Sequence, residues 1–381
     1  FELGRPFSNL ELDAAPARVL NAYKDEGYYY ATVGTAVDYS PDRTRARARF
    51  IINEQKPVVI EEYEIRGADR TDHDLILSRL ALCRDLEDCT DDERRFRRNL
   101  VRKSEEQVAT LGTFSSVSIV LEDPDVPQER KRVIITVSEL KRQYVEPSGG
   151  FYTGDGIRLG AEYGLRNIGG LGISLTVRLE FAFLPNFLIF DDNVRANYAG
   201  LDVGDRIERR NTGTFRFPDV GRGPQVDFVI NAVDARDNQR DFGLTREALL
   251  PTLSYRPARN ATLQLGVSTE LNDVNQFNFE NIDDAISGNA NLRQLLRVPD
   301  GQTVASAQRV SANWDRRDKP LAATRGTLMN ASIEHVSAFP FNNRSTDDES
   351  FRSEFLRFNS QVAGYIPLTD GGWALALSVA A

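Results

Sequence analysis

The sequence predicts a region of two α+β modules of β-α-α-β-β type, the first incomplete, followed by an antiparallel transmembrane β-barrel with about eleven strands present. Two observations carry this prediction. Up to about residue 140, helical and strand-like stretches alternate, whereas beyond it one segment after another alternates apolar and polar side chains, as strands do. Several of these segments run for about ten residues or more, the length that a tilted membrane-spanning strand needs. A transmembrane helix is excluded, because no run of 18 apolar residues occurs.

The first module, assigned to residues 1–56, lacks an opening strand. Apolar residues recur at helical spacing up to Tyr23, and Gly27 then ends the predicted helix, because glycine favours the left-handed conformation found after a helix. Strands are expected at about 29–39 and 44–53. The missing strand indicates that the chain is cut from something longer.

The second module, assigned to residues 57–141, has the complete order of elements. It repeats the first, since residues 105–141 and 20–56 both run helix, glycine, strand, turn, strand at a constant offset. Its expected elements are a strand at 57–67, a helix from Thr71 and Asp72 to about Leu82, a helical stripe from Phe96 to Leu111, and strands at about 114–122 and 132–139.

The only two cysteines, Cys83 and Cys89, lie between the two helices of the second module. Their C-x5-C spacing in an acidic loop fits a small disulfide formed in an oxidising compartment. The alternative is a pair of free thiols in a cytosolic protein. We favour the disulfide, because no neighbour in the sequence would lower a thiol pKa.

The remaining residues, 142–381, are assigned to the N-terminal portion of the barrel. Residues 157–165 and 173–183 show the pattern clearly, with leucine, isoleucine, valine and aromatic side chains on one face and charged or small ones on the other. The expected connections alternate between short ones (153–156, 167–171, 257–260 and 318–325) and long polar ones (184–203, 273–303 and 338–350). Short turns at one end and long loops at the other are typical of outer-membrane barrels.

The composition excludes several functional classes. With 47 basic and 56 acidic residues, the formal net charge is −9, which argues against nucleic-acid binding because that affinity depends on phosphate neutralisation. Two histidines and two cysteines are too few for a His/Cys metal cluster. No phosphate-binding glycine loop, G-x-S-x-G elbow or H-E-x-x-H motif occurs. We therefore expect no catalytic residue, no metal and no cofactor, and a protein that is not an enzyme.

Two stretches carry a family resemblance. GGFYTGDGIRLGAEYGLRNIGGLG (149–172) and NWDRRDKPLAATRGTLMNASIEH (313–335) resemble the BamA/TamA-type outer-membrane β-barrel assembly superfamily, whose members carry periplasmic POTRA modules before a 16-stranded barrel. The β-α-α-β-β modules are similar to POTRA repeats. The second stretch follows the family's strand-turn-strand pattern with Asp315, Arg317, Asp318, Pro320 and Gly326.

The chain departs from the family pattern in two places. Ala323 or Thr324 stands where a second proline is common, and no R-G-F or R-G-Y triplet occurs. We expect the chain to end before the loop that carries this triplet, so that it is truncated at both ends. One interpretation of Asp315 and Asp318 is a general acid/base pair. We favour the other, in which they cap the turn and pair with Arg316, Arg317 or Arg325.

The resemblance, joined to these residues, implies a function based on strand pairing. An exposed sheet edge in each POTRA module would bind an extended client strand by β-augmentation, with Tyr29, Val33, Phe114 and Val117 as the candidate edge residues. The barrel would open laterally at its first strand. That strand contains Pro147, Gly149 and Gly150, and proline and glycine both weaken strand pairing.

The expected location is the bacterial outer membrane, with the N-terminal modules in the periplasm. Expected partners are unfolded outer-membrane or secreted client proteins, periplasmic or outer-membrane accessory subunits, and outer-membrane lipid, with no nucleic acid. The function that the resemblance implies is assembly, insertion or translocation of polypeptides, and the alternative is a two-partner-type secretion pore. A plain porin or receptor is disfavoured because it lacks two mixed α/β modules.

Overall fold

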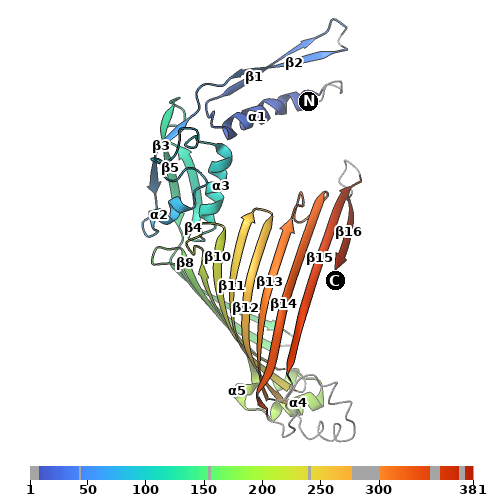
Figure 1. Ribbon diagram of the computed structural model, residues 1–381. Coiled ribbons are helices and arrows are strands. Elements are labelled where there is room, and N and C mark those ends of the chain that lie inside the picture. The colour runs from blue at the N-terminus through green and yellow to red at the C-terminus, as the bar shows by residue number, and fades with distance from the viewer. Residues whose placement is uncertain are drawn as a thin grey trace. The chain divides into compact units, whose positions relative to one another are not determined.

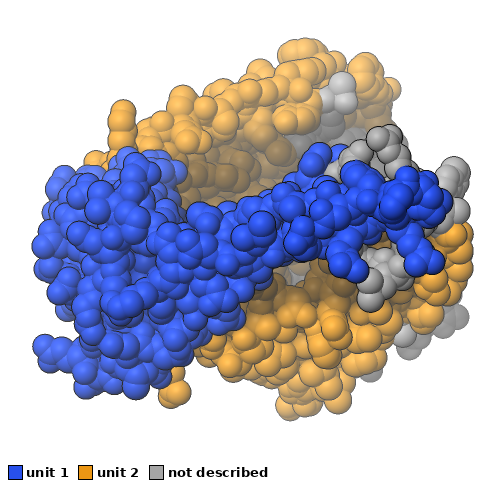
Figure 2. Space-filling model, turned by 90° about the horizontal axis from the view of Figure 1, so that it is seen from above, with its two compact units in different colours: residues 1–140, 169–172 blue, residues 141–168, 173–381 orange. Residues whose placement is uncertain are grey.

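The computed structural model describes residues 8–42, 44–152, 156–238, 242–276, 301–343, 352–368 and 374–380 (Figure 1). The chain divides into two compact units, coloured separately in Figure 2. Unit 1 comprises residues 1–140 and 169–172, and unit 2 comprises residues 141–168 and 173–381. Among the described residues, no helix has both the length and the apolar content that crossing a bilayer requires.

The first module consists of one helix and one hairpin. Helix α1 (Asn9–Asp25) begins at Ser8, whose hydroxyl oxygen accepts the N–H of Glu11 at 3.4 Å. Gly27 follows the helix with φ of +95°, the left-handed conformation that glycine adopts without strain. Strands β1 (Thr32–Tyr39) and β2 (Ala46–Asn53) then pair antiparallel as a two-stranded sheet.

The second module has the predicted β-α-α-β-β order. Its elements are β3 (Val59–Arg66), α2 (His73–Ser78), α3 (Arg98–Ala109), β4 (Phe114–Leu121) and β5 (Arg130–Glu139). The sheet order is β3-β5-β4, with β5 parallel to β3 and antiparallel to β4, so that β3 and β4 are its two edges (Figure 1).

The core of this module is formed by one face of the sheet and the inner sides of its helices. Alternate residues of β5 are buried to 3% exposure or less, and the helices contribute Ile76, Val101 and Val108. Helix α2 is shorter than predicted, ending at Ser78 instead of near Leu82. Beyond the helix, the N–H of Ala81 donates to the hydroxyl oxygen of Ser104 on α3, at 2.8 Å.

Unit 2 contains a single curved sheet of eleven strands in which each strand pairs antiparallel with the next (Figure 1). The strands are β6 (Gln143–Tyr152), β7 (Gly156–Ile168), β8 (Ile173–Phe183), β9 (Ile207–Phe217), β10 (Val226–Asn238), β11 (Phe242–Ala258), β12 (Ala261–Gln276), β13 (Gly301–Asp315), β14 (Gly326–Asn343), β15 (Ser353–Pro367) and β16 (Ala374–Ala380). The sheet order runs from β16 to β6, so β6 and β16 are its edges in the described chain.

Most predicted strands are present and several are longer than expected. Strand β12 continues to Gln276 and β14 to Asn343, into segments that were predicted as connections. The predicted turn at 153–156 and long connections at 273–303 and 338–350 lie largely outside the described residues. The connection after β8 contains a 3-10 helix η1 (Asn186–Leu188) and the helices α4 (Asp192–Ala199) and α5 (Val203–Arg206), none of which was predicted.

The large sheet has one apolar face and one polar face. Cross-strand partners such as Leu159 and Phe181 lie on the apolar face and are 62% and 44% exposed. On the opposite face Arg178 of β8 binds Glu162 of β7, with Nε to Oε2 at 2.9 Å. An exposed apolar face would be costly in water and is the face that a barrel turns to lipid.

This assignment of faces predicts that arginine substitutions on the two faces of β8 change the stability of the sheet by different amounts. Leu179→Arg on the apolar face should destabilise the membrane-inserted sheet by roughly 2–4 kcal/mol if it lies near the bilayer midplane. Thr176→Arg, on the polar face of the same strand, should cost much less. Folding yield into lipid vesicles, measured across a urea series, compares the two variants. Equal losses would contradict a lipid-facing surface.

Candidate functional site

The edge of β4 carries backbone groups that no strand pairs in the described chain. The N–H of Glu122 donates to the carbonyl of Arg132 at 3.0 Å, which makes this a hydrogen-bonded pair of the β4–β5 ladder. Because such pairs alternate along an antiparallel ladder, Val117, Ile119 and Leu121 point their N–H and C=O groups away from β5. At Ile119 the outward N–H donates to Oε1 of Glu105 on α3, at 2.9 Å.

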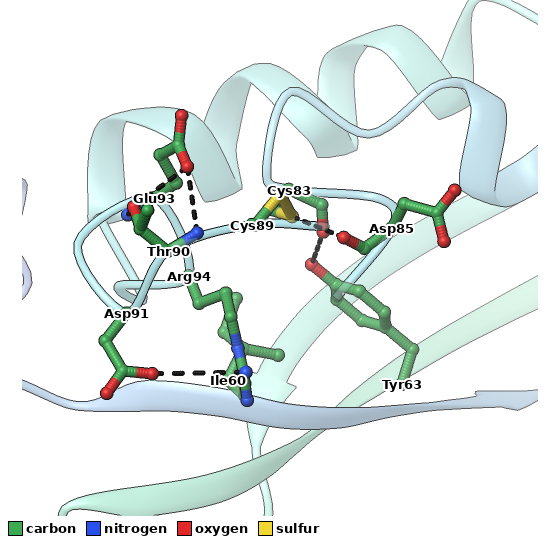
Figure 3. Close-up of a disulfide and its surroundings, with 9 residues drawn as sticks. All are labelled: Ile60, Tyr63, Cys83, Asp85, Cys89, Thr90, Asp91, Glu93 and Arg94. Atoms are coloured by element: carbon green, nitrogen blue, oxygen red, sulfur yellow. Dashed lines mark hydrogen bonds and ion pairs between the residues drawn. A yellow bond between two sulfur atoms is a disulfide. The ribbon is translucent and has the colours of Figure 1, made fainter. Parts of the chain in front are cut away.

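The other edge of this sheet is already covered by the chain itself over its first residues. The N–H of Ile60 donates to the carbonyl of Arg94, and the N–H of Phe96 donates to the carbonyl of Val58, both at 2.8 Å. The Arg94 guanidinium also donates to the carbonyl of Ile60 through Nε and Nη2, each at 3.1 Å (Figure 3). Of the two edges, β4 is therefore the more open to an incoming strand.

The edge of β1 presents backbone groups in the same way. The N–H of Ser40 donates to the carbonyl of Arg45 at 2.9 Å, which places the hydrogen-bonded pairs of the hairpin at even residues of β1. Val33 and its odd-numbered neighbours therefore point their backbone groups outward. The predicted edge residues Val33 and Val117 both lie on strands with such an edge.

One predicted edge residue does not lie on a strand, and another has a side chain that is buried in the core. The prediction for Tyr29 is wrong, because β1 begins at Thr32 and the Tyr29 ring packs edge-on against Phe96 with 5.8 Å between centroids. Phe114 does lie on β4, but its side chain is 7% exposed and belongs to the core, beside a register irregularity. In both cases an aromatic side chain soon after a glycine packs into the module's interior. Its position in the sequence does not show whether such a side chain is buried or lies on the surface of a strand.

The edge of β6 places Pro147 where a partner strand would bind. The N–H of Arg166 donates to the carbonyl of Arg142 at 2.7 Å, in register with the β6–β7 ladder. Even residues of β6 are therefore bonded to β7, and odd residues, including Pro147 and Gly149, face the free edge. Pro147 has no N–H, so this edge lacks one donor near its middle.

Strand β6 pairs with β7 along its whole length, and a contact between a guanidinium and a tyrosine ring lies at each end, with Arg158 at 5.2 Å from the Tyr152 ring at the far end. The hydroxyl of Tyr144 donates to Oε1 of Glu162 at 2.7 Å, and the guanidinium of Arg166 stacks 4.1 Å from the centre of the Tyr144 ring. All residues of β6 except Tyr144 are exposed. Tyr144 was not predicted from the sequence, because its position depends on the strand register. It pairs across the ladder with Gly164, where a Cβ would lie 1.8 Å from the Tyr144 ring, so only glycine leaves room for the ring.

The turn between β13 and β14 brings together the motif predicted from residues 313–335. Arg317 binds the carboxylate of Asp315 with two nitrogens, Nε at 2.9 Å and Nη2 at 2.7 Å, and donates through Nη1 to the carbonyl of Pro320 at 2.9 Å. Gly326 starts β14 with φ of +111°, and a Cβ there would lie 2.1 Å from the carbonyl oxygen of Arg316. The motif therefore specifies one tight turn conformation.

Asp318 closes the same turn through backbone groups. Its Oδ1 accepts the N–H groups of Thr324 at 2.9 Å and Arg325 at 3.1 Å, and its Oδ2 accepts the Thr324 hydroxyl at 2.7 Å. The Thr324 hydroxyl and these N–H groups hold the pKa of Asp318 far below its usual range. A proline at position 324 could not donate this N–H, so the closed turn needs a residue other than proline there.

The loop between α2 and α3 is closed by a disulfide between Cys83 and Cys89 (Figure 3). The hydroxyl of Tyr63 on β3 donates to the carbonyl of Cys83 at 2.6 Å, which fastens this loop to the sheet. A disulfide that closes so short a loop stabilises the folded state by about 2 kcal/mol in the chain-entropy description.

Comparison with known proteins places the sheet in one family. Residues 152–381 match the Omp85 superfamily domain. The chain is similar to the crystal structure of BamA from Haemophilus ducreyi lacking POTRA domains 1–3, with a TM-score of 0.56, 14% identity, and coverage of 99% of this chain and 65% of that one. It is also similar to CdiB from Escherichia coli, with a TM-score of 0.46, 12% identity, and coverage of 96% and 60%. No curated protein matches the sequence significantly. The chain thus spans less than two thirds of the length of these structures.

The turn geometry predicts opposite tolerance at two strand glycines. Gly326→Ala should destabilise the folded sheet by about 2 kcal/mol or more, because the left-handed backbone is strained and the new Cβ meets a carbonyl oxygen. Gly364→Ala on β15 is the matched control, since nothing lies within 4 Å of its Cβ position. Urea midpoints for folding into detergent micelles measure both variants, and a Gly326 variant as stable as the Gly364 variant would contradict this account of the turn.

Proposed function

Because this chain belongs to the Omp85 superfamily, we propose that it inserts or translocates polypeptides at the bacterial outer membrane. The observation that carries this proposal is the β6 edge, whose outward backbone groups face no strand in the described chain and which lacks a donor at Pro147. Such an edge is a template on which a client strand can form.

We assign a separate role to each of the two units. Residues 1–56 are part of one POTRA module and residues 57–141 form a second, both in the periplasm. Residues 142–381 form the N-terminal portion of the barrel, with the apolar face in contact with outer-membrane lipid. The disulfide between Cys83 and Cys89 supports a periplasmic location for the second module, because that compartment is oxidising.

The barrel would open laterally along β6. Pro147 leaves the strand that pairs with this edge one hydrogen bond short, which weakens the seam by about 1 kcal/mol. Gly149 and Gly150 contribute no side chains to cross-strand contacts. The ladder to β7 and the Tyr144 contacts hold β6 in the sheet on one side, so its other edge, which includes Pro147 and Gly149, is the part that can pair with a client strand.

The modules would deliver the client as an extended chain. The outward N–H and C=O groups of β4 can accept a strand by β-augmentation, and Val117 lies at the centre of that edge. Accessory subunits at the outer membrane or in the periplasm would use the remaining module surfaces. No step in this scheme needs a cofactor.

A second candidate function is a secretion pore of the two-partner type. The observation that favours it is a cavity of about 710 Å³ lined mainly by residues of β12–β15. Its lining is rich in uncharged hydrogen-bonding side chains, including Gln264, Ser311, Asn330, Asn359 and Gln361. Such a lining can satisfy the backbone groups of an unfolded polypeptide without holding it tightly.

A disulfide lock tests lateral opening. A cysteine at Gly149, paired with one on the last barrel strand of the full-length protein, should leave folding intact and reduce client insertion at least tenfold, with recovery on reduction. The matched control is a Gly213→Cys, Ala232→Cys pair, which joins the cross-strand partners of β9 and β10 away from the seam. Reductant also reaches the Cys83–Cys89 bond, and the control corrects for this.

The same experiment separates the two candidate functions. Insertion at the normal rate by the locked protein would contradict lateral opening. Continued export of a polypeptide through the locked barrel would favour the secretion pore instead.

A further inference from the structure

The open edge of the second module holds an intramolecular substitute for part of a bound strand. Oε1 of Glu105 accepts the N–H of Ile119 at 2.9 Å, reaching the edge of β4 from helix α3. A strand adding to β4 would offer its own backbone carbonyl to that N–H. Glu105 therefore occupies one of the positions that a client strand needs.

Strand β4 itself carries no charge or proline that would protect it against unwanted pairing beyond the irregularity near Phe114. Its eight residues, FSSVSIVL, include no charged residue and no proline. Uncharged edges of this kind pair readily with other strands, and natural proteins guard them with charges placed at the edge. Here the guarding charge comes from the helix that packs against the strand.

The two edges of the same sheet are guarded differently. At the β3 edge, two backbone hydrogen bonds and the Arg94 guanidinium together cover Ile60 and the preceding residue Val58, just before the strand. The Arg94 side chain is only 18% exposed. On β4, a single side-chain hydrogen bond covers Ile119, and the Glu105 side chain can turn away from it. The β3 cover is thus built mainly from backbone hydrogen bonds, whereas the β4 cover is one side chain that an incoming strand can displace.

We propose that Glu105 is a displaceable cap that makes the β4 edge selective for extended segments bearing a lysine or arginine. The inference rests on the proposed role of β4 as a client-binding edge. When a strand docks, its backbone carbonyl accepts the Ile119 N–H in place of Glu105. The released Glu105 carboxylate then lies beside the side chains of the docked strand. A basic side chain at that position pairs with the released carboxylate, whereas an uncharged strand receives no such compensation.

Two synthetic ten-residue peptides with the same alternating apolar pattern test this selectivity on the full-length protein. One peptide carries lysine and the other glutamine at the residue that would lie beside Glu105. We expect the lysine peptide to bind wild type about tenfold more tightly, the strength of one charge-assisted contact. In Glu105→Gln the ratio should fall to about one, while Glu129→Gln, which alters a carboxylate paired with Lys56, should keep the wild-type ratio.

Hydrogen exchange at the Ile119 amide provides a readout independent of the peptides. Without ligand, this amide should exchange faster in Glu105→Gln than in wild type, because a neutral amide is a weaker acceptor than a carboxylate. A peptide preference or Ile119 protection that survives Glu105→Gln unchanged would overturn the cap. If both peptides bind wild type equally, the cap fails but the docking edge stands; if neither binds, the docking edge fails and the cap with it.

Discussion

Every backbone N–H and C=O group of a strand needs a hydrogen-bond partner, and the last strand of a sheet has a row of them without one. This constraint governs both units. In the described chain the three-stranded sheet has edges at β3 and β4, and the eleven-stranded sheet has edges at β6 and β16. In a lipid environment the requirement becomes stricter, because no water is present to satisfy an unpaired group.

The chain meets this constraint with a different device at three of these edges. Its own backbone covers the start of β3, a carboxylate from α3 covers Ile119 on β4, and Pro147 removes a donor from β6. The first device closes an edge, and the other two leave an edge that is only partly satisfied. A partly satisfied edge can exchange partners at small cost, which is the property that strand insertion requires.

The positions of the strands could be predicted from the sequence, whereas the contacts at the strand edges could not. Alternation of apolar and polar residues depends on local geometry, so the strands of the large sheet were predictable, as was the turn at Asp318. The side of β6 that Pro147 faces depends on register with β7, and the contact of Glu105 with Ile119 depends on how α3 packs. The burial of the Phe114 ring was not predicted for the same reason, since tertiary packing decides its position.

The most direct test of an underpaired seam is the hydrogen exchange of β6 amides in the full-length protein within a membrane, corrected for intrinsic rates. The account predicts that the amides of Val145, Gly149 and Phe151, which face the seam, exchange about tenfold or more faster than those of Ser148 and Gly150, which face β7. Equal protection of the two sets would show that the seam is fully paired, and would contradict the account.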